Sequence, residues 1–208
     1  MKTRRLGKTG LMVSEIGFGG EWLERHPEEE GIELIHYASS LGINILDCWM
    51  ADPKSRDIIG KGIKENRSNW FIQGHIGSTW KDEQYFRTRD MKYVRPAFED
   101  LLKRLQTDYI DMGMIHYVDS EEEWEQIQHS DYLDYVMELK NSGVIRHIGI
   151  SSHNPKVAIK AAESGYVEMI LFSINPAFDM LPASENIDTM FAEEFDAGLK
   201  GIDGDRAR

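Results

Sequence analysis

Cysteine is nearly absent from this sequence, whose 208 residues contain a single one, Cys48. One thiol excludes an intramolecular disulfide and a multi-cysteine zinc or iron–sulfur site built from this chain alone. We therefore expect Cys48 to be a core residue. Long apolar runs are absent too, since no stretch reaches the roughly 18 apolar residues of a membrane span. Residues 1–7 lead into no apolar run, unlike a signal peptide, so we expect a cytoplasmic protein with no membrane partner.

Basic residues are too few to balance the acidic ones. Lys and Arg number 24 against 36 Asp and Glu, which gives a formal net charge of -12. A molecule of this sign repels phosphate backbones and anionic lipid surfaces, so we expect no nucleic-acid partner. A local Arg or Lys is still able to bind an anionic cofactor. The length favours one sizeable domain over two.

The sequence also lacks a glycine-rich dinucleotide-binding turn after any predicted strand, which disfavours a Rossmann fold. Short apolar runs instead alternate with segments of helical periodicity. The predicted strands span 16–19, 43–49, 69–76, 109–116, 145–151 and 167–174, and the predicted helices between them span 28–41, 54–65, 90–105, 131–141 and 155–164. Ahead of them, a turn at 7–10 joins extended pieces near 2–6 and 11–14, which predicts a hairpin.

Three local patterns add detail to these predictions. Pro96 lies inside the predicted helix 90–105, where a proline is awkward, so we expect it to mark a later start or a kink. Asn154 and Pro155 are suited to cap and open the helix 155–164. The acidic cluster at 119–123 follows a strand, and we predict that it forms a solvated loop.

Strict alternation of near-continuous apolar strands with helices predicts a parallel sheet covered by helices. Polar residues stand at or just after the carboxyl ends of the strands, which is where TIM-barrel enzymes have their active sites. These residues are Asp47, His75, His116, Ser151, Ser152 and Asn175. We predict an α/β fold, a (β/α)8 TIM barrel truncated after its sixth strand, because such a barrel needs about 250 residues. The prediction is one domain over 1–208, with the hairpin at 1–16 and a loop and the start of the next helix at 177–208.

Four sequence blocks carry a family resemblance. They are RLGKTGLMVS at 5–14, GINILD at 42–47, LQTDYID at 105–111 leading to His116, and GVIRHIGIS at 143–151. In order and spacing they resemble the N-terminal hairpin and the second, fourth and fifth strands of aldo/keto reductases. The likeness covers the chain to about residue 176. It implies an oxidoreductase that transfers a hydride between NAD(P)H and a small-molecule carbonyl or alcohol.

The resemblance also implies a catalytic tetrad of Asp, Tyr, Lys and His. Asp47 and His116 stand at the family's Asp and His positions, whereas Asp52 replaces the Tyr and His75 replaces the Lys. Hydride transfer to a carbonyl leaves an alkoxide that must be protonated. A histidine near a carboxylate titrates near neutrality. We therefore predict an altered tetrad of Asp47, Asp52, His75 and His116, in which His75 or His116, braced by Asp47, donates the proton. Tyr117 lies beside His116 but is a poor substitute for the missing Tyr, because successive strand residues face opposite ways.

On the cofactor side the resemblance implies NADP. Ser151 matches the Ser after the family's fifth strand, Ser152 stands at its Asn position, and Leu171 stands at the position of its Gln. We predict a cofactor site of Ser151, Ser152, Asn154 and Asn175, with His153 as an alternative to Asn154. The family binds the adenosine phosphate with later βα units, so we expect weak NADP binding by these residues alone. Some similar members continue into a C-terminal ferredoxin-like iron–sulfur segment.

Two functional interpretations from different classes stay open at this point. The first is an oxidoreductase with a modified tetrad. The second is a non-catalytic barrel that acts as a binding or regulatory module, because a fold does not fix a function. Asp47, Asp52, His75 and His116 follow no known order of metal ligands, so no metal site is predicted. An unclosed sheet leaves two exposed edges, which predicts self-association.

Overall fold

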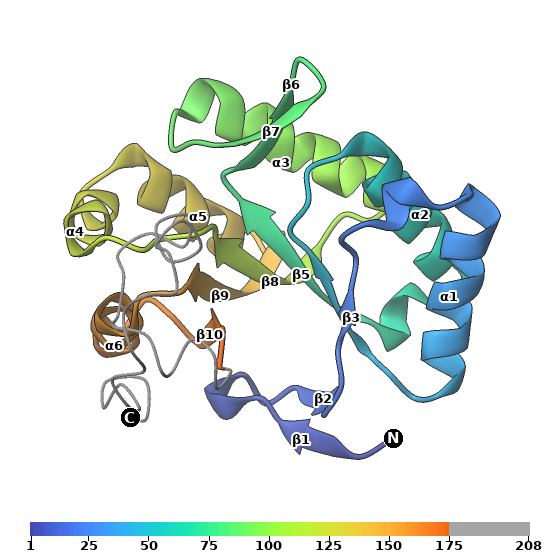
Figure 1. Cartoon of the computed structure of the whole chain (residues 1–208). Coiled ribbons are helices and arrows are strands. Elements are labelled where there is room, and N and C mark those ends of the chain that lie inside the picture. The colour runs from blue at the N-terminus through green and yellow to red at the C-terminus, as the bar shows by residue number, and fades with distance from the viewer. Residues whose placement is uncertain (175–208) are drawn as a thin grey trace, which may run out of the picture.

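A six-stranded parallel sheet forms the centre of the computed structural model, which describes residues 1–174. Its strands are β3 (Phe18–Gly19), β4 (Ile45–Cys48), β5 (Phe71–Ile76), β8 (Ile110–Ile115), β9 (Ile145–Ser152) and β10 (Met169–Phe172). They lie in chain order from β3 to β10, and every neighbouring pair is parallel. The sheet curls around a central space with the helices outside it (Figure 1). The predicted α/β barrel architecture with six strands is thereby confirmed.

Helices cover the outer face of this sheet. They are α1 (Glu28–Ser40), α2 (Pro53–Ile63), α3 (Met91–Leu105), α4 (Glu121–Gln128), α5 (Asp131–Asn141) and α6 (Pro155–Glu163), with short 3-10 turns η1 (Gly7–Thr9), η2 (Leu23–Arg25) and η3 (Lys64–Asn69). Asn154 caps α6 as predicted, since its side chain accepts the N–H of Lys156. Helix α3 begins at Met91, ahead of Pro96, so the proline does not set its start. None of the helices in residues 1–174 is long and apolar enough to cross a bilayer.

The hydrophobic core lies between the sheet and the helices. Cys48 is buried in it, as predicted. Helices α2 and α3 approach closely at Gly60, where a Cβ atom would lie 2.0 Å from the carbonyl oxygen of Arg104. Only a glycine is compatible with this backbone contact, because no real Cβ approaches an oxygen so closely. Gly60 therefore fixes the distance between the two helices that flank β5.

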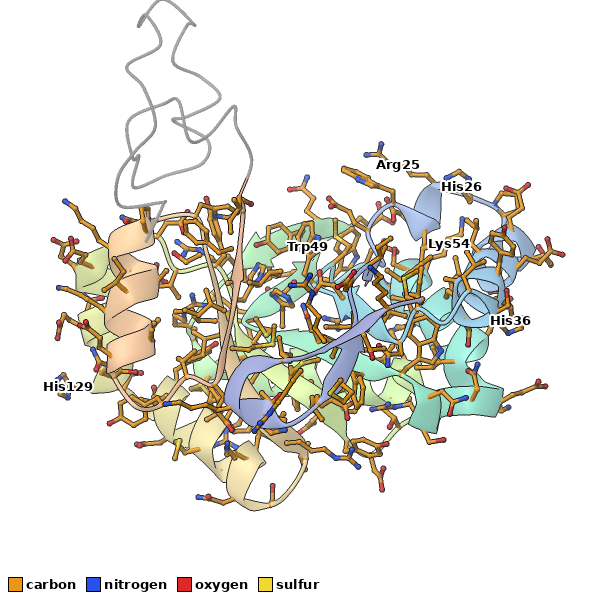
Figure 2. The ribbon with its side chains drawn as sticks, turned by 90° about the horizontal axis from the view of Figure 1, so that it is seen from below. Arg25, His26, His36, Trp49, Lys54 and His129 are labelled. Carbon is orange, nitrogen blue, oxygen red and sulfur yellow. The ribbon has the colours of Figure 1, made fainter. Side chains whose placement is uncertain are left out.

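The N-terminal hairpin packs on the inner face of the sheet. It consists of β1 (Thr3–Arg5) and β2 (Met12–Ser14), as predicted. In Figure 1 it lies beside the opening between β3 and β10, and in the turned view of Figure 2 it passes in front of the strands. Leu6 and Leu11 pack against a second buried cluster of Met112, Met114 and Met169. The hairpin thereby covers the apolar part of the inner face.

A second hairpin, absent from our predictions, follows β5. Strands β6 (Ser78–Lys81) and β7 (Gln84–Arg87) pair in an antiparallel register that sets Trp80 opposite Tyr85. The two connecting residues, Asp82 and Glu83, have φ angles of 52° and 61°. Two consecutive positive φ values match the right-handed twist of a tight hairpin, as in a type I′ turn. The hairpin projects beside α3 (Figure 1).

The acidic cluster at 119–123 leads into a helix and is not a solvated loop, so that prediction is wrong. Ser120 caps α4, and Glu121, Glu122 and Glu123 form its first turn. Carboxylates are favourable there because the helix N-terminus exposes unpaired N–H groups and carries a partial positive charge. Asp119, just ahead of the helix, is buried. The run of acidic residues therefore marks the start of a helix, whereas from the sequence alone we interpret it only as a sign of solvent exposure.

Candidate active site

Polar residues of the inner face meet at the carboxyl ends of the parallel strands. In the register of the sheet, Asp47 on β4 lies beside Gln73 on β5, and His75 lies beside Met114 on β8. His116 follows β8 directly, two residues beyond Met114, and alternation along a strand continues that face. The structure thus brings Asp47, His75 and His116 together. Their chemical roles stay predictions.

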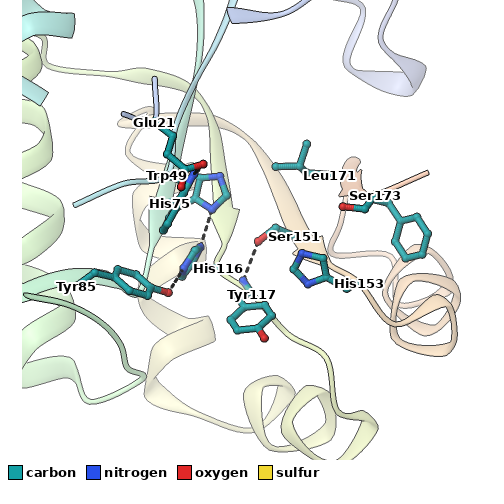
Figure 3. A pocket seen from close by; sticks show the side chains of 11 residues that line it. Glu21, Trp49, His75, Tyr85, His116, Tyr117, Ser151, His153, Leu171 and Ser173 are labelled. Carbon is teal, nitrogen blue, oxygen red and sulfur yellow. Dashed lines mark hydrogen bonds between the residues drawn. The ribbon is translucent and has the colours of Figure 1, made fainter. Parts of the chain in front are cut away.

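A cavity of about 570 Å³ opens at this end of the sheet. Its lining is shown in Figure 3 and comprises Glu21, Trp49, His75, Tyr85, His116, Tyr117, Ser151, His153, Leu171, Phe172 and Ser173. These residues come from three strands of the sheet (β5, β9 and β10), from the β6–β7 hairpin and from the connections that follow the strands. Polar groups that converge in a mainly apolar cavity are typical of a small-molecule site.

Four side chains form one continuous hydrogen-bonded chain at this cavity (Figure 3 shows the last two links). Asp47 Oδ1 lies 3.0 Å from His75 Nε2, and Gln73 Nε2 donates to the same oxygen at 3.1 Å. His75 Nδ1 lies 2.8 Å from His116 Nδ1, and His116 Nε2 lies 2.6 Å from the hydroxyl of Tyr85. The chain therefore runs from a carboxylate through two imidazoles to a phenol.

The carboxylate end sets the direction of donation along this chain. A carboxylate only accepts, so His75 Nε2 carries a proton and His75 Nδ1 is an acceptor in the neutral ring. His116 Nδ1 must then donate to His75, which leaves His116 Nε2 as the acceptor of the Tyr85 hydroxyl. All ring nitrogens of both histidines are used within the chain.

Burial keeps His116 neutral. Loss of solvation holds the pKa of His116 well below its usual range, and electrostatic interactions with His75, Arg89, Arg87 and His153 act in the same direction. The His116 side chain is almost fully buried. A neutral His116 agrees with the direction of donation derived above, in which one of its nitrogens donates and the other accepts.

Two arginines fix the backbone turn that follows β8. Arg87 Nη1 donates to the carbonyl oxygen of Tyr117, and Arg89 Nη2 donates to that of His116. Glu123 on α4 binds both arginines, with its oxygens 2.8 Å from Arg87 Nη1 and 3.1 Å from Arg89 Nη2. The acidic first turn of α4 therefore anchors the β6–β7 hairpin against the site.

Trp49 forms an aromatic wall of the cavity. Its ring lies 6.0 Å from that of His116 with 10° between the planes, and its edge contact with the Tyr85 ring spans 5.3 Å between ring centres. The Ser78 hydroxyl on β6 donates to the Trp49 carbonyl. The indole N–H donates to Glu21 Oε2 at 3.3 Å. Burial raises the pKa of Glu21, an effect that the Trp49 hydrogen bond partly offsets.

The predicted cofactor residues differ in their placement. Ser151 lines the cavity, and its Oγ accepts a backbone N–H at 2.7 Å. Ser152 and Asn154 are buried beside Asp119: Ser152 Oγ donates to the Asp119 carboxylate at 3.2 Å, and Asn154 Nδ2 donates to its carbonyl oxygen at 2.9 Å. Asn175 lies outside the described residues. Ser151 alone of the three described residues is part of the cavity lining.

Asp52 and Tyr117 have environments that the sequence did not indicate. Asp52 caps α2, because its Oδ1 accepts the N–H of Ser55 at 3.0 Å, and it is not part of the cavity lining. Tyr117 does line the cavity, so the expectation that it faces away from the side of His116 does not hold. Strand β8 ends at Ile115 and Tyr117 has a φ of 51°, so strand alternation no longer applies to it. The predicted catalytic role of Asp52 stays a prediction.

Tyr85 is the member of the chain that sequence reasoning missed. The available signal was weak: two short runs of strand-forming residues, STW and QYF, flank a short polar segment with no Asn-Gly or Asp-Gly turn. Alternation along β7 then separates the neighbours, since Phe86 packs against Tyr93 of α3 while Tyr85 contacts His116. The hairpin thus supplies a phenol to the site, whereas Asp52 stands at the family's Tyr position.

Comparisons with known proteins agree with this architecture. The sequence profile of the aldo/keto reductase family matches residues 15–199. The uncharacterized oxidoreductase YqkF of Bacillus subtilis is 30% identical over 186 residues, which cover 88% of this chain and 58% of the relative. An aldo-keto reductase from Bacillus halodurans, in its holo form, matches with a TM-score of 0.69 and 30% identity over 84% of this chain and 58% of that one.

A more distant solved structure shares the fold alone. The aldo-keto reductase from Klebsiella pneumoniae in complex with NADPH has a TM-score of 0.62 at 21% identity, over 81% of this chain and 57% of that one. This chain therefore spans less than two thirds of the length of the relatives described here.

Proposed function

The chain belongs to the aldo/keto reductase family, and from this membership we propose that it is an oxidoreductase that moves a hydride between NAD(P)H and a carbonyl or alcohol group of a small molecule. The observation that carries the proposal is the hydrogen-bonded chain from Asp47 to the cavity wall. Reduction of a carbonyl requires a proton at the oxygen as the hydride reaches the carbon, and a buried acid–base chain meets that requirement.

The walls of the cavity fit the nicotinamide end of such a cofactor. That end is a planar ring with a carboxamide group. Among the lining residues Trp49 and Leu171 offer apolar surface, and the Ser151 hydroxyl offers a polar partner. NADP(H), when bound, supplies or accepts the hydride. The formal charge of -12 disfavours an anionic ligand at long range, so local groups must hold its phosphates.

The residues of the chain would orient the substrate and handle its proton. The cavity is closed on one side by Trp49 stacked on His116, which excludes water from the buried links of the chain. In a site of low polarity each hydrogen bond is stronger than in water. We propose Asp47, His75 and His116 as the acid–base group, with Asp47 bracing His75 through the bond at 3.0 Å.

The substrate class is a small carbonyl compound or alcohol without strong negative charge. Glu21 lines the cavity, while Arg87 and Arg89 near the site are already bound to Glu123. An anionic substrate group would therefore meet a carboxyl group and no unpaired arginine in the described lining. Hydroxyl and carbonyl groups fit better, because Glu21 and Ser151 offer hydrogen-bonding atoms.

Urea unfolding with and without NADPH tests cofactor binding, and turnover tests the reaction. A ligand that binds only the folded state at ~100 times its dissociation constant adds about 2.7 kcal/mol to the unfolding free energy. We expect a higher urea midpoint with NADPH and oxidation of NADPH by members of a panel of aldehydes and ketones. A midpoint that ignores NADPH would contradict cofactor binding by this chain.

The alternative function, a non-catalytic binding or regulatory module, predicts a different pair of results. NADPH would then raise the midpoint without any turnover across the panel. The His75→Ala variant tests the proposed acid–base group directly, since it removes the link between Asp47 and His116. Turnover at the wild-type rate in this variant would remove His75 from the mechanism.

A further inference from the structure

A second cavity lies between the β6–β7 hairpin and the helices α2 and α3. Its volume is about 420 Å³, which is in the range of small-molecule pockets. The hairpin and α3, which form most of its walls, lie side by side in Figure 1. The charged and aromatic side chains used below are Arg56, Lys81, Phe86, Lys92, Tyr93 and Asp100. In the described part of the chain, the linings of this cavity and of the active-site cavity share no residue.

We propose that this second cavity is a binding site of its own, for a phosphate group carried on a flat aromatic ring. Three features of the lining support the proposal: a buried arginine with an unpartnered nitrogen, an excess of positive charge, and an aromatic wall. The proposal does not depend on hydride transfer, because none of the residues that carry it belongs to the active-site lining.

Arg56 of α2 is the buried cation of this cavity. Its side chain is only 2% exposed, and Nη1 donates to the carbonyl oxygen of Ala97 on α3 at 3.1 Å. Arg56 Nε is buried as well and has no hydrogen-bond partner within residues 1–174. A buried donor without an acceptor is costly in free energy, and more so on a charged group. An oxyanion bound in the cavity would supply such an acceptor.

The lining is positively charged in a protein whose formal net charge is -12. It contains Arg56, Lys81 and Lys92 but one acidic residue, Asp100. Both oxygens of Asp100 accept from Arg104 Nε at 2.9 Å, whereas the contact with Arg56 Nη1 is longer, at 3.4 Å. Asp100 is therefore balanced first by Arg104, an arginine outside the lining. The three cations of the lining remain to attract an anion.

Arg56 keeps its charge in spite of its burial. Loss of solvation lowers the pKa of Arg56, and the negative charge of Asp100 opposes this shift. A guanidinium group nevertheless stays protonated in proteins, so it offers donors and no acceptor. Charge-assisted bonds from such a group to a phosphate are stronger than neutral hydrogen bonds.

The two lysines are held at the face of one aromatic ring. Lys81 Nζ on β6 and Lys92 Nζ on α3 each lie 5.5 Å from the centre of the Tyr93 ring. Attraction between an ammonium group and a ring favours this placement. Asp82 is an acidic neighbour of Lys81, but it lies 4.0 Å away and is 86% exposed, so the pair is weak. Lysine ammonium groups bind phosphate as compact charges.

An aromatic wall completes the cavity. The rings of Phe86 and Tyr93 meet edge to face, with 5.5 Å between their centres and 82° between their planes. A flat ring of a ligand gains contact with such a wall in stacked or edge-to-face geometry. A phosphate monoester carries close to two negative charges at neutral pH, which suits three cations better than the single charge of a carboxylate. A ring that bears a phosphate therefore uses both parts of the lining.

The first experiment measures the affinity of the 208-residue chain for phenyl phosphate by titration calorimetry. Inorganic phosphate and phenol serve as probes of the two halves of the ligand. We expect phenyl phosphate to bind about 10-fold more tightly than inorganic phosphate, because of the aromatic contact. Phenol should bind more weakly than both. Inorganic phosphate that binds as tightly as phenyl phosphate would overturn the aromatic part of the proposal.

Variants of the cations test the site itself. We expect the double variant Lys81→Gln/Lys92→Gln to bind phenyl phosphate about 10-fold more weakly, since each exposed charge contributes modestly. Lys103→Gln is the matched control, because Lys103 is an exposed lysine of the same helix outside the lining. Arg56→Met should weaken binding by about 10-fold to 100-fold. Circular dichroism checks that each variant is folded, and the lysine variants decide the question if Arg56→Met does not fold.

A third measurement locates the ligand. Phenyl phosphate should shift the backbone amide resonances of Thr79, Phe86 and Ala97, which line the second cavity, and leave that of Ser151 in the active-site cavity unchanged. NADPH also carries aromatic rings and phosphates, so the titration is repeated in excess NADPH. An unchanged affinity for phenyl phosphate is expected from two separate sites.

Three results would overturn the proposal. The first is equal affinity for phenyl phosphate in the wild type and in Lys81→Gln/Lys92→Gln. The second is a shift of the Ser151 resonance without shifts at Thr79, Phe86 and Ala97. The third is displacement of phenyl phosphate by NADPH, which would make the second cavity a part of the cofactor site.

Discussion

Burial of a neutral His116 predicts a specific loss of stability in acid. The pKa of His116 is held well below its usual range, first by burial and then by the charges around it. Below about pH 6.5 the histidine of the unfolded chain gains a proton that the native state does not take up. The unfolded state then binds more protons than the native state, so the unfolding free energy falls as the pH falls.

The magnitude follows from linkage. For a histidine with an unfolded pKa of about 6.5 that stays neutral in the native state, the unfolding free energy falls by about 2 kcal/mol between pH 7 and pH 5. Other groups titrate in the same range, so the informative quantity is the stability difference between the wild type and His116→Asn. This difference should narrow by about 2 kcal/mol over the interval, because the variant lacks the imidazole.

Urea unfolding at pH 7, 6 and 5, followed by circular dichroism, measures this difference. His36→Asn, at an exposed position of α1, provides the control for removal of an imidazole. Parallel stability curves for the wild type and His116→Asn would refute a neutral, buried His116. If the stability difference between the wild type and His116→Asn instead widens as the pH falls, His116 is protonated in the native state. His116 would then donate to the Tyr85 hydroxyl, the reverse of the direction derived above.

Two further predictions concern the surroundings of the site. Glu123→Gln removes the charge that binds Arg87 and Arg89. We expect the unfolding free energy, measured in urea, to fall by about 1 to 2 kcal/mol, because these ion pairs are only partly exposed. An equal loss in the exposed control Glu125→Gln would contradict a stabilising role of these ion pairs. Within the described residues β3 and β10 end the sheet, and we propose that these edges self-associate. Sedimentation velocity should then show a species that grows with concentration, and a single concentration-independent species would contradict the proposal.

The sequence by itself determined the architecture and part of the site. Alternating apolar runs and helical periods identified all six strands of the sheet, because parallel strands buried on both faces have near-continuous apolar sequences. Position at the strand ends then placed Asp47, His75 and His116 close together, since the carboxyl ends of parallel strands lie at one edge. These features are encoded locally, in periods of two to four residues.

Only the tertiary structure decided which atoms meet within that site. The contact between Tyr85 and His116 joins residues 31 apart, and it depends on a turn at Asp82 and Glu83 and on the ion pairs of Glu123 with the hairpin. The bonds of Ser152 and Asn154 to Asp119 likewise cross between separate connections. No local period encodes such contacts, because they arise from the docking of one folded segment on another. The amino-acid sequence therefore determined where the chemistry lies, and the packing of the β6–β7 hairpin decided that a phenol stands at its outer end.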